Sequence, residues 1–269
     1  MGVLRQLCQY CHWRTPAKFK VSTMVFYIAY KASKENRGLI SRRLNALGCR
    51  RICSSFWEVE NRKVEEALKI IGENQPVLLK RTREIRRPIY DEEGNIIDFG
   101  SLLIIVYNAK KDDGRKIRWL LSRTPYIKIC RSVYAFCHNN NKYDKKGGLF
   151  NANYLFTLMK ENDKDAKIFS RMTIIDKDAK TVKMLLDRVR MRIERKTKSI
   201  LNGYMKLMKK NIEGQIEKRH LTDEEKKLYG KFVALRKMSI FYERWLKLNF
   251  SKDLMRIYST IRKLHTMKT

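Results

Sequence analysis

Acidic residues are scarce in this sequence. It holds 28 Asp and Glu against 60 Lys and Arg, which leaves a formal net charge of +32. Self-repulsion at that charge destabilises a compact chain, so we expect a polyanion to neutralise it. Thermophile surfaces also carry many charges, but they mix both signs and do not leave a two-to-one excess of base. The charge therefore predicts contact with the phosphate backbone of a nucleic acid.

Long apolar runs are also missing. The longest, Val25 to Tyr30 and Leu102 to Tyr107, are too short to span a bilayer, and the amino terminus has no signal-peptide core. We therefore expect a cytoplasmic protein without membrane contact. Only four prolines and 12 glycines occur, and 43% of the residues are hydrophobic, which is typical of a folded body rather than a basic tail.

Short catalytic motifs are absent too. The chain has no P-loop, no dinucleotide-binding glycine motif and no G-x-S-x-G, and its four histidines form no local cluster. We therefore expect no cofactor. Cys8 and Cys11 form one C-x-x-C pair, which Cys49 and Cys53 would complete as a zinc site. The alternative for Cys53 is a small buried core residue.

What the sequence does have is an internal repeat. Ile28–Trp57 aligns without gaps with Ile105–Tyr134 at a shift of 77, with nine identities in thirty positions. The identical pairs are Ile28/Ile105, Tyr30/Tyr107, Ala32/Ala109, Lys34/Lys111, Ile40/Ile117, Leu44/Leu121, Ile52/Ile129, Cys53/Cys130 and Ser55/Ser132. Basic Arg51 falls on basic Lys128. This regularity indicates a duplication.

Each copy reads as alternating strands and helices. The apolar runs that open the copies predict buried strands, and helix-period segments follow them. Gly48 is placed to end the first helix. Further strands are predicted at Arg51–Glu60 and Val77–Ile85, and at Lys128–Cys137 and Ala166–Ile175. If the second predicted strand of each copy is itself a hairpin of two strands, this β-α-β-α-β order becomes βαββαβ. That order predicts a ferredoxin-like unit.

The expected fold class is α+β, with two tandem ferredoxin-like (βαββαβ) units packed as a pseudo-dimer. Helices cover one face of such a sheet, and strands that are apolar on both faces need the other copy against the open face. A basic α-helical region follows. We assign residues 1–22 to an N-terminal extension, 23–90 and 91–177 to the repeats, and 178–269 to the helical domain.

The stretch Tyr27-Ile-Ala-Tyr-Lys-Ala-Ser and the strand Arg51-Ile-Cys-Ser-Ser-Phe-Trp-Glu58 resemble the second CRISPR-associated (Cas) protein and its relatives of the VapD type. The resemblance covers residues 24 to 85 and, more loosely, 101 to 176. It implies small ferredoxin-like units that pair sheet to sheet and bind or cut nucleic acid.

The position that carries catalysis in that family departs from its pattern. Nuclease members close the first strand with an Asp, and pairing brings two such carboxylates together around a divalent metal. Here Lys31 and Asn108 occupy those positions. An ammonium group cannot ligate Mg²⁺, and a neutral amide is a poor substitute for a carboxylate. The chain therefore resembles a non-catalytic member, unless the turn residues Asp112 and Asp113 supply a metal site.

Candidate phosphate-binding residues follow from the clusters of Lys and Arg on or beside the repeats and from a basic stripe on the first C-terminal helix. Guanidinium groups suit bidentate phosphate contact. The candidates are Arg42, Arg43, Arg50, Arg51, Lys80, Arg81, Arg83, Arg86, Arg87, Arg188, Arg192, Arg195 and Lys196. On the strand, Arg81 and Arg83 should share a face with Val77 and Leu79.

From about Asp178 the spacing of apolar residues becomes helical. It predicts a long helix interrupted near Gly203, a second opened by a capping box at Thr222, and a third capped by Ser251. Residues 181–269 hold 24 basic and nine acidic residues, about half the excess charge. These helices would either clamp nucleic acid or dock a protein partner.

Three functions follow from these features. The first is non-catalytic nucleic-acid binding on a pseudo-two-fold platform extended by basic helices. The second is a metal-dependent nuclease of the same fold family, and the third is a structural component of a ribonucleoprotein. DNA and RNA are not distinguished, because base readout depends on a few side chains whose placement the sequence leaves open.

Overall fold

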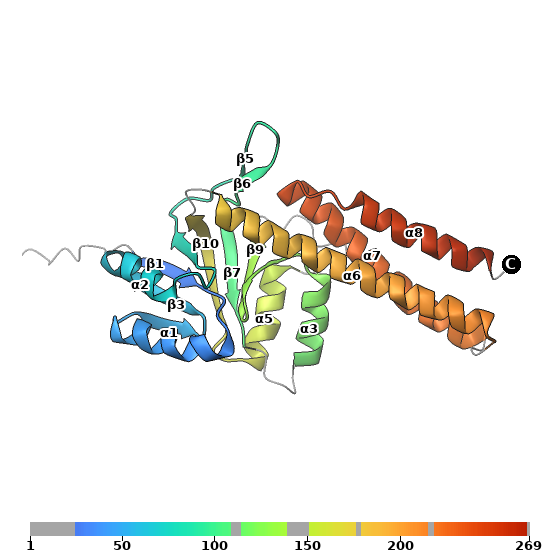
Figure 1. Cartoon of the computed structure of the whole chain (residues 1–269), viewed down its shortest axis with the longest axis horizontal. Helices are drawn as coiled ribbons and strands as arrows, with labels where there is room; N and C mark the ends of the chain where they lie inside the picture. The colour runs from blue at the N-terminus through green and yellow to red at the C-terminus, as the bar shows by residue number, and fades with distance from the viewer. Residues whose placement is uncertain (1–24, 109–113, 139–150, 176–178, 215–217, 268–269) are drawn as a thin grey trace, which may run out of the picture.

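The computed structural model describes residues 25–108, 114–138, 151–175, 179–214 and 218–267. They form a mixed α+β body built on a large antiparallel sheet, from which three C-terminal helices extend as an arm (Figure 1). No helix in these ranges is long and apolar enough to cross a membrane.

The body has two halves with the same sequence of elements. The first runs β1 (Val25–Ala29), α1 (Lys34–Ala46), β2 (Arg50–Cys53), β3 (Phe56–Glu60), α2 (Val64–Ile71) and β4 (Val77–Arg81). The second runs β7 (Leu102–Val106), α3 (Gly114–Arg123), β8 (Ile127–Cys130), β9 (Val133–Cys137), α5 (Ala152–Asn162) and β10 (Lys167–Ile175). A small hairpin of β5 (Ile89–Tyr90) and β6 (Ile96–Asp98), which the sequence did not indicate, lies between them.

The strand register repeats at the shift of 77. The sheet order is β2-β3-β1-β4-β10-β7-β9-β8, so each half has its strands in the same order outward from the junction. Ile28 pairs with Trp57, and Ile105 pairs with Tyr134. The β2–β3 hairpin has a bulge between Arg51 and Cys53, just before its turn. The β8–β9 hairpin has one at the equivalent position, between Lys128 and Cys130. The two halves therefore agree in pairing as well as in sequence.

The two halves fold onto each other at a bulge in β10. Tyr27 pairs with Leu79 on β4, and Leu79 pairs with Ile174 on β10, five residues from Phe169. A flat sheet would separate Tyr27 from Phe169 by roughly 19 Å. Their ring centroids are 5.3 Å apart, because the register of β10 shifts between Phe169 and Met172. The sheet is continuous, but its halves face each other.

Three hydrophobic cores follow from this arrangement. One lies under α1 and α2 and contains Ile28 and Trp57, and another lies under α3 and α5 and contains Ile105 and Tyr134. The third joins the inner faces of both halves to the C-terminal helices. The other copy alone was expected to cover the open face, but α6 (Lys180–Ile212) shares that role, because the nine apolar or small residues on its buried side need a partner surface.

The arm differs from expectation at three points. Helix α6 runs through Gly203 without interruption, and a Cβ there would lie 2.5 Å from Leu228 Cδ2 on α7 (Lys218–Leu246), so this glycine permits close helix packing. Thr222 lies inside α7 rather than at its start. Helix α8 (Ser251–Thr266) has Phe250 as its N-cap without a side-chain hydrogen bond.

Two expectations about the first half have opposite outcomes. Gly48 follows the end of α1 with a φ of 76°, as a helix-ending glycine should, which confirms its role. Strand β4, however, ends at Arg81, so Arg83 lies beyond it and does not share a strand face with Val77. The Thr82 N–H still donates to the carbonyl of Arg171 on β10 (2.9 Å), and Arg83 lies beyond this last backbone hydrogen bond between the two segments.

Candidate nucleic-acid interface

A hollow of about 520 Å³ opens where the segment after β1, strand β8 and helix α6 meet. We call it the basic hollow. Of the described residues that line it, seven are cationic and none is acidic. The cations are Lys31, Arg37, Lys128, Arg131, Arg188, Arg192 and Arg195. Elements from both halves of the body and from the arm therefore contribute charge of one sign to one concave surface.

The first half contributes Lys31 and Arg37 through the start of α1. The Lys31 N–H donates to the carbonyl of Asn74 at 2.8 Å, which fixes the chain where it leaves the sheet. Ser33 then caps α1 by accepting from the Asn36 N–H at 3.2 Å. One turn on, an Arg37 Nη donates to the carbonyl of Ala32, while its buried Nε has no partner among the described residues. An unpaired buried donor favours an external acceptor.

Helix α6 is fastened to β8 by Arg188. Its guanidinium donates to the carbonyls of Lys128 and Ile129 and to the side-chain oxygen of Gln75, the last at 2.6 Å. Burial lowers the pKa of Arg188, and no carboxylate balances its charge among these contacts. The hydrogen bonds satisfy the donors of Arg188, but they leave its positive charge in the hollow.

Arg192 lies one turn further along α6 and makes the largest set of contacts. It donates to the Tyr126 carbonyl (3.3 Å) and the Tyr242 hydroxyl (2.8 Å), and to two carbonyls at the end of α3. Its guanidinium also lies over the Tyr126 ring. Lys196, a further turn on, donates to the Ser122 carbonyl at 2.7 Å. Three predicted phosphate ligands thus also hold the arm to the body.

The remaining cations of the basic hollow are available to a ligand. Lys31, Lys128, Arg131 and Arg195 are exposed. Partial burial lowers the pKa of Lys128, and the neighbouring charges of Arg192, Arg131 and Arg195 lower it further. That mutual repulsion is relieved when an anion enters the hollow.

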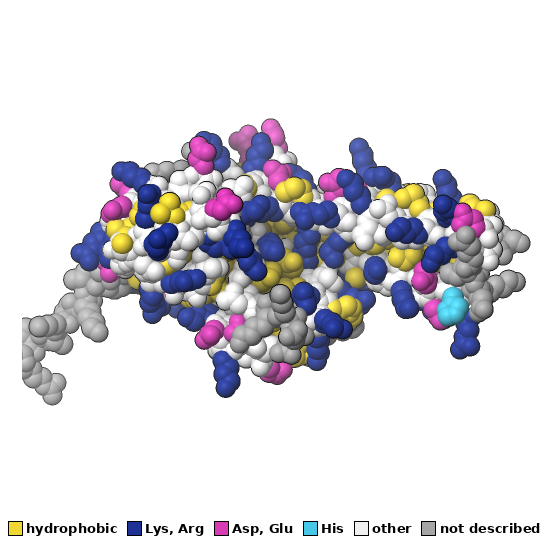
Figure 2. All heavy atoms as spheres, turned by 60° about the horizontal axis from the view of Figure 1, so that its bottom comes forward, with side chains coloured by type: hydrophobic (Ala, Val, Ile, Leu, Met, Phe, Trp, Pro, Cys, Tyr) yellow, Lys and Arg dark blue, Asp and Glu magenta, His cyan; other side chains and the backbone are white. Residues whose placement is uncertain are grey.

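Adjoining hollows continue the basic surface along α6. One shares Lys31 and Arg188 with the basic hollow and adds Lys180 and Lys183, with Asp187 as its acid. In the other direction the line passes through hollows whose described lining holds one acid, Glu224, and the cations Arg195, Lys198, Lys206, Lys210, Lys227 and Lys231. Of these, Lys198 pairs with Glu194 at 2.8 Å. From Lys183 to Lys210, α6 spans about 40 Å. Figure 2 shows Lys and Arg side chains spread over both the body and the arm on one face.

The other predicted candidates lie outside the hollows described here. Arg50 pairs with Glu58 at 2.6 Å and Arg86 with Asp98 at 3.7 Å, so part of their charge is balanced. The rest are exposed on α1, β2, β4 and the segment after β4, and their role stays a prediction. They are Arg42, Arg43, Arg51, Lys80, Arg81, Arg83 and Arg87.

Sequence reasoning missed Arg37, Lys128 and Arg131. Lys128 was visible as the equivalent of Arg51 at the shift of 77, and it alone had a signal in the sequence. Arg131 aligns with Ser54, and Arg37 lies singly in α1. Only the meeting of the two halves with α6 brings these residues together.

Lys31 and Asn108, the two positions that the sequence predicts as a degenerate nuclease site, have different surroundings. Lys31 lines the basic hollow. The Asn108 side-chain oxygen accepts from the Ser132 hydroxyl at 2.6 Å. The Asn108 backbone N–H donates to the buried Asp163 carboxylate at 3.2 Å. No three His, Cys, Asp or Glu side chains gather as metal ligands in the described ranges. Asp112 and Asp113 lie outside them.

The zinc alternative is not supported by the cysteines that the structure describes. Cys49 belongs to the core under α1 and α2, whereas Cys53 belongs to the core between the two halves and the C-terminal helices. The two thiols therefore do not converge. Burial raises the pKa of both. Cys53 is 6% exposed, which confirms it as a buried core residue. Cys8 and Cys11 lie outside the described residues.

Comparison with known proteins gives the chain no relative. No protein-family model, no curated protein and no solved structure matches it. The fold and the basic hollow are therefore the basis for a function.

Proposed function

We propose that this chain is a non-catalytic protein that holds the phosphate backbone of a nucleic acid. The observation that carries the proposal is the basic hollow, whose lining among the described residues includes seven cations and no acid. Concave surfaces of one charge sign focus the electrostatic field and concentrate counter-ions. A chain at +32 that gathers cations in this way is best neutralised by a polyanion.

The line of hollows along α6 supports an extended ligand rather than a small anion. Cations follow one another from Lys183 to Lys210, about 40 Å along the helix axis. Each strand of a DNA duplex presents a phosphate about every 3.4 Å along the helix axis, so several fit beside this length. The arm thus extends the contact that begins at the basic hollow.

For the body we propose two ferredoxin-like units in tandem, packed as a pseudo-dimer. In support, each half has the element order βαββαβ, the same strand order and the same hairpin register at a shift of 77. The fold-back at β10, with Phe169 against Tyr27, supports face-to-face packing. This arrangement fits a degenerate relative of the second CRISPR-associated protein and VapD-type proteins.

The non-catalytic part of the proposal rests on Lys31 and Asn108. The ammonium of Lys31 repels a divalent cation, and the Asn108 amide oxygen already accepts from Ser132. In place of a metal that polarises the phosphate, Lys31 offers a charge that binds it. A carboxylate at this position would bind a metal for cleavage. Lysine at the same position would bind the phosphate backbone without cleaving it.

A salt titration tests this function. Fluorescence anisotropy would follow labelled duplex DNA, duplex RNA and single strands of each between about 50 and 300 mM salt, with Mg²⁺ or Mn²⁺ present. We expect binding at low salt that weakens linearly on logarithmic axes, with the strand recovered intact. Absence of binding to every ligand at about 50 mM salt would refute the proposal, and cleavage would favour the nuclease alternative.

A further inference from the structure

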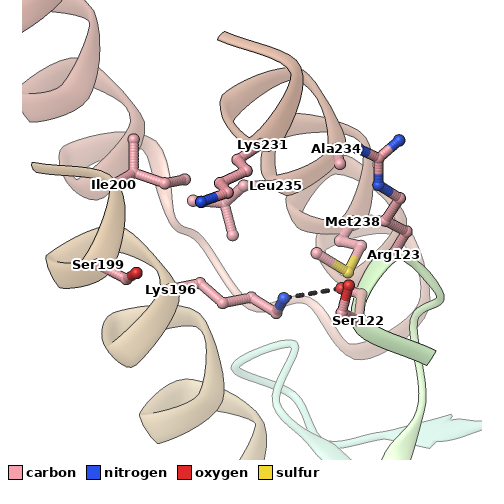
Figure 3. Close-up of a pocket in the computed structure, with 9 residues that line it drawn as sticks. All are labelled: Ser122, Arg123, Lys196, Ser199, Ile200, Lys231, Ala234, Leu235 and Met238. Carbon is pink, nitrogen blue, oxygen red and sulfur yellow. Dashed lines mark hydrogen bonds between the residues drawn. The ribbon is translucent and has the colours of Figure 1, made fainter. Parts of the chain in front are cut away.

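Another hollow, of about 210 Å³, lies between the end of α3, the middle of α6 and α7 (Figure 3). We call it the three-helix pocket. Its polar lining consists of Ser122, Arg123, Lys196, Ser199 and Lys231, and its apolar lining of Ile200, Ala234, Leu235 and Met238. No described acidic residue lines it. It touches the line of hollows along α6, with which it shares Ser199 and Lys231.

Lys196 is the unusual residue of this pocket. Its ammonium reaches across from α6 to the Ser122 carbonyl, as the dashed line in Figure 3 marks. Burial, together with the neighbouring charges of Arg192 and Arg123, lowers its pKa to about 8. Lys231 faces the same space from α7, so α3, α6 and α7 all present positive charge.

The concentration of positive charge in the three-helix pocket is unfavourable for folding unless an anion binds there. A half-buried ammonium beside two guanidinium groups destabilises the fold unless a negative charge compensates it. The described residues supply only a neutral carbonyl to Lys196, while the Arg123 guanidinium lies 4.3 Å from the centroid of the Trp119 ring. Serine hydroxyls complete a set of donors suited to phosphate oxygens.

We propose that the three-helix pocket binds a phosphate monoester, carried by the end of a nucleic-acid strand or by a free nucleotide. A monoester carries close to two negative charges at neutral pH, whereas an internal diester carries one, so it better balances Lys196 and its neighbours. Ile200, Leu235 and Met238 offer an apolar wall to the attached sugar or base. The strand-end form of this inference rests on the proposed function, with the strand following α6.

Matched oligonucleotides test the inference. Anisotropy would compare strands of one sequence that end in a 5′-phosphate, a 3′-phosphate or hydroxyls only, and nucleoside monophosphate would compete with each. We expect one phosphorylated end to bind about tenfold more tightly than the hydroxyl end, and Lys196→Met or Lys231→Met to abolish the difference. The control Lys252→Met changes the same charge on exposed α8 and should preserve it.

Two further readouts separate ligand binding from a structural role. Without ligand, Lys196→Met should change the melting temperature little, because removal of an uncompensated charge offsets the loss of the hydrogen bond to the Ser122 carbonyl. At pH 8, binding of a monoester should take up protons, since the phosphate raises the Lys196 pKa, and calorimetry in two buffers measures that uptake. A large loss of stability in Lys196→Met together with no proton uptake would show that Lys196 only anchors α3.

The possible outcomes are distinct from those of the proposed function. Equal affinity for phosphorylated and hydroxyl ends would overturn this inference while strand binding itself persists. Monophosphate binding that depends on Lys231, without strand binding, would support the pocket in its nucleotide form and contradict the proposed function. Lys231 is exposed, so its variant remains informative if Lys196→Met does not fold.

Discussion

The guanidinium carbon of Arg192 lies 3.7 Å from the centroid of the Tyr126 ring, and the same arginine donates to the Tyr126 carbonyl. The Tyr242 hydroxyl joins them, because it donates to that carbonyl at 2.7 Å and accepts from Arg192. One basic residue of α6 therefore connects the end of α3, the residue before β8 and α7. Cations of α6 thus reinforce the apolar packing that attaches the arm to the body.

Arg192→Met should destabilise the protein by about 2 kcal/mol, because the carbonyls of Leu121, Thr124 and Tyr126 each lose the Arg192 donor. The Tyr242 hydroxyl still donates to the Tyr126 carbonyl and the Thr124 N–H to the Leu121 carbonyl, which limits the loss. Urea unfolding measures the change. The matched control is Arg190→Met on the same helix, whose exposed pair with Asp187 should be worth less than about 1 kcal/mol. Equal effects of the two variants would contradict this role for Arg192.

Cys130 should resist alkylation in the folded protein at pH 8. Burial, together with neighbouring Cys53, raises its pKa to about 12, so only about one part in 10⁴ is thiolate at that pH. Mass spectrometry after iodoacetamide treatment should find half-buried Cys137 modified before Cys130. In guanidinium the cysteines should react alike, and a folded-state rate for Cys130 equal to that of Cys137 would be inconsistent with its burial.

The same shift has a consequence for stability. Because the pKa of Cys130 is higher in the folded than in the unfolded chain, its contribution is complete below about pH 9. It is then lost as the pH rises toward 12. A Cys130→Ala variant should therefore lose less stability than the wild type between pH 9 and 11. Parallel stability curves over that interval would argue against the shift.

Gly100→Ala should cost about 2 kcal/mol or more. Gly100 has a φ of 67°, and an added Cβ would lie 2.5 Å from the carbonyl oxygen of Arg86, which is backbone and cannot swing aside. Gly38→Ala in α1 is the opposite case, since nothing lies within 4 Å of the added Cβ. It should stabilise by up to about 1 kcal/mol through helix propensity. Thermal unfolding should give a lower melting temperature for Gly100→Ala and a higher one for Gly38→Ala. Shifts in the same direction would contradict this account.

Much of the body could be predicted from the sequence because its signals are local. Short apolar runs indicated the strands, and Gly48 indicated a helix end. The identities at a shift of 77 predicted two equivalent halves, and the pairing of Ile28 and Ile105 agrees with them. The fold-back at β10 had no such signal, since it depends on a bulge at which Arg171 adopts a φ of 57°.

The candidate site was harder to predict, because a helical stripe of cations does not reveal which surface it faces. Arg188, Arg192 and Lys196 were expected to face a ligand, yet their donors bind carbonyls of the body. Conversely, Arg37 and Arg131 are unremarkable in the sequence and become part of a hollow only when distant segments meet. Local spacing identifies elements, whereas the site is set by tertiary contacts.

Charge reversal in the basic hollow tests the central claim most directly. The double variant Lys31→Glu/Arg131→Glu alters exposed residues that have no part in holding the arm. Its control, Lys252→Glu/Lys263→Glu, makes the same charge change on α8. If the hollow holds the phosphate backbone, the hollow variant should bind duplex at least tenfold more weakly, and its salt slope should fall by about 1.8, while the control keeps both near wild type. Equal losses in the two variants would mean that net charge alone, and not this hollow, binds the nucleic acid.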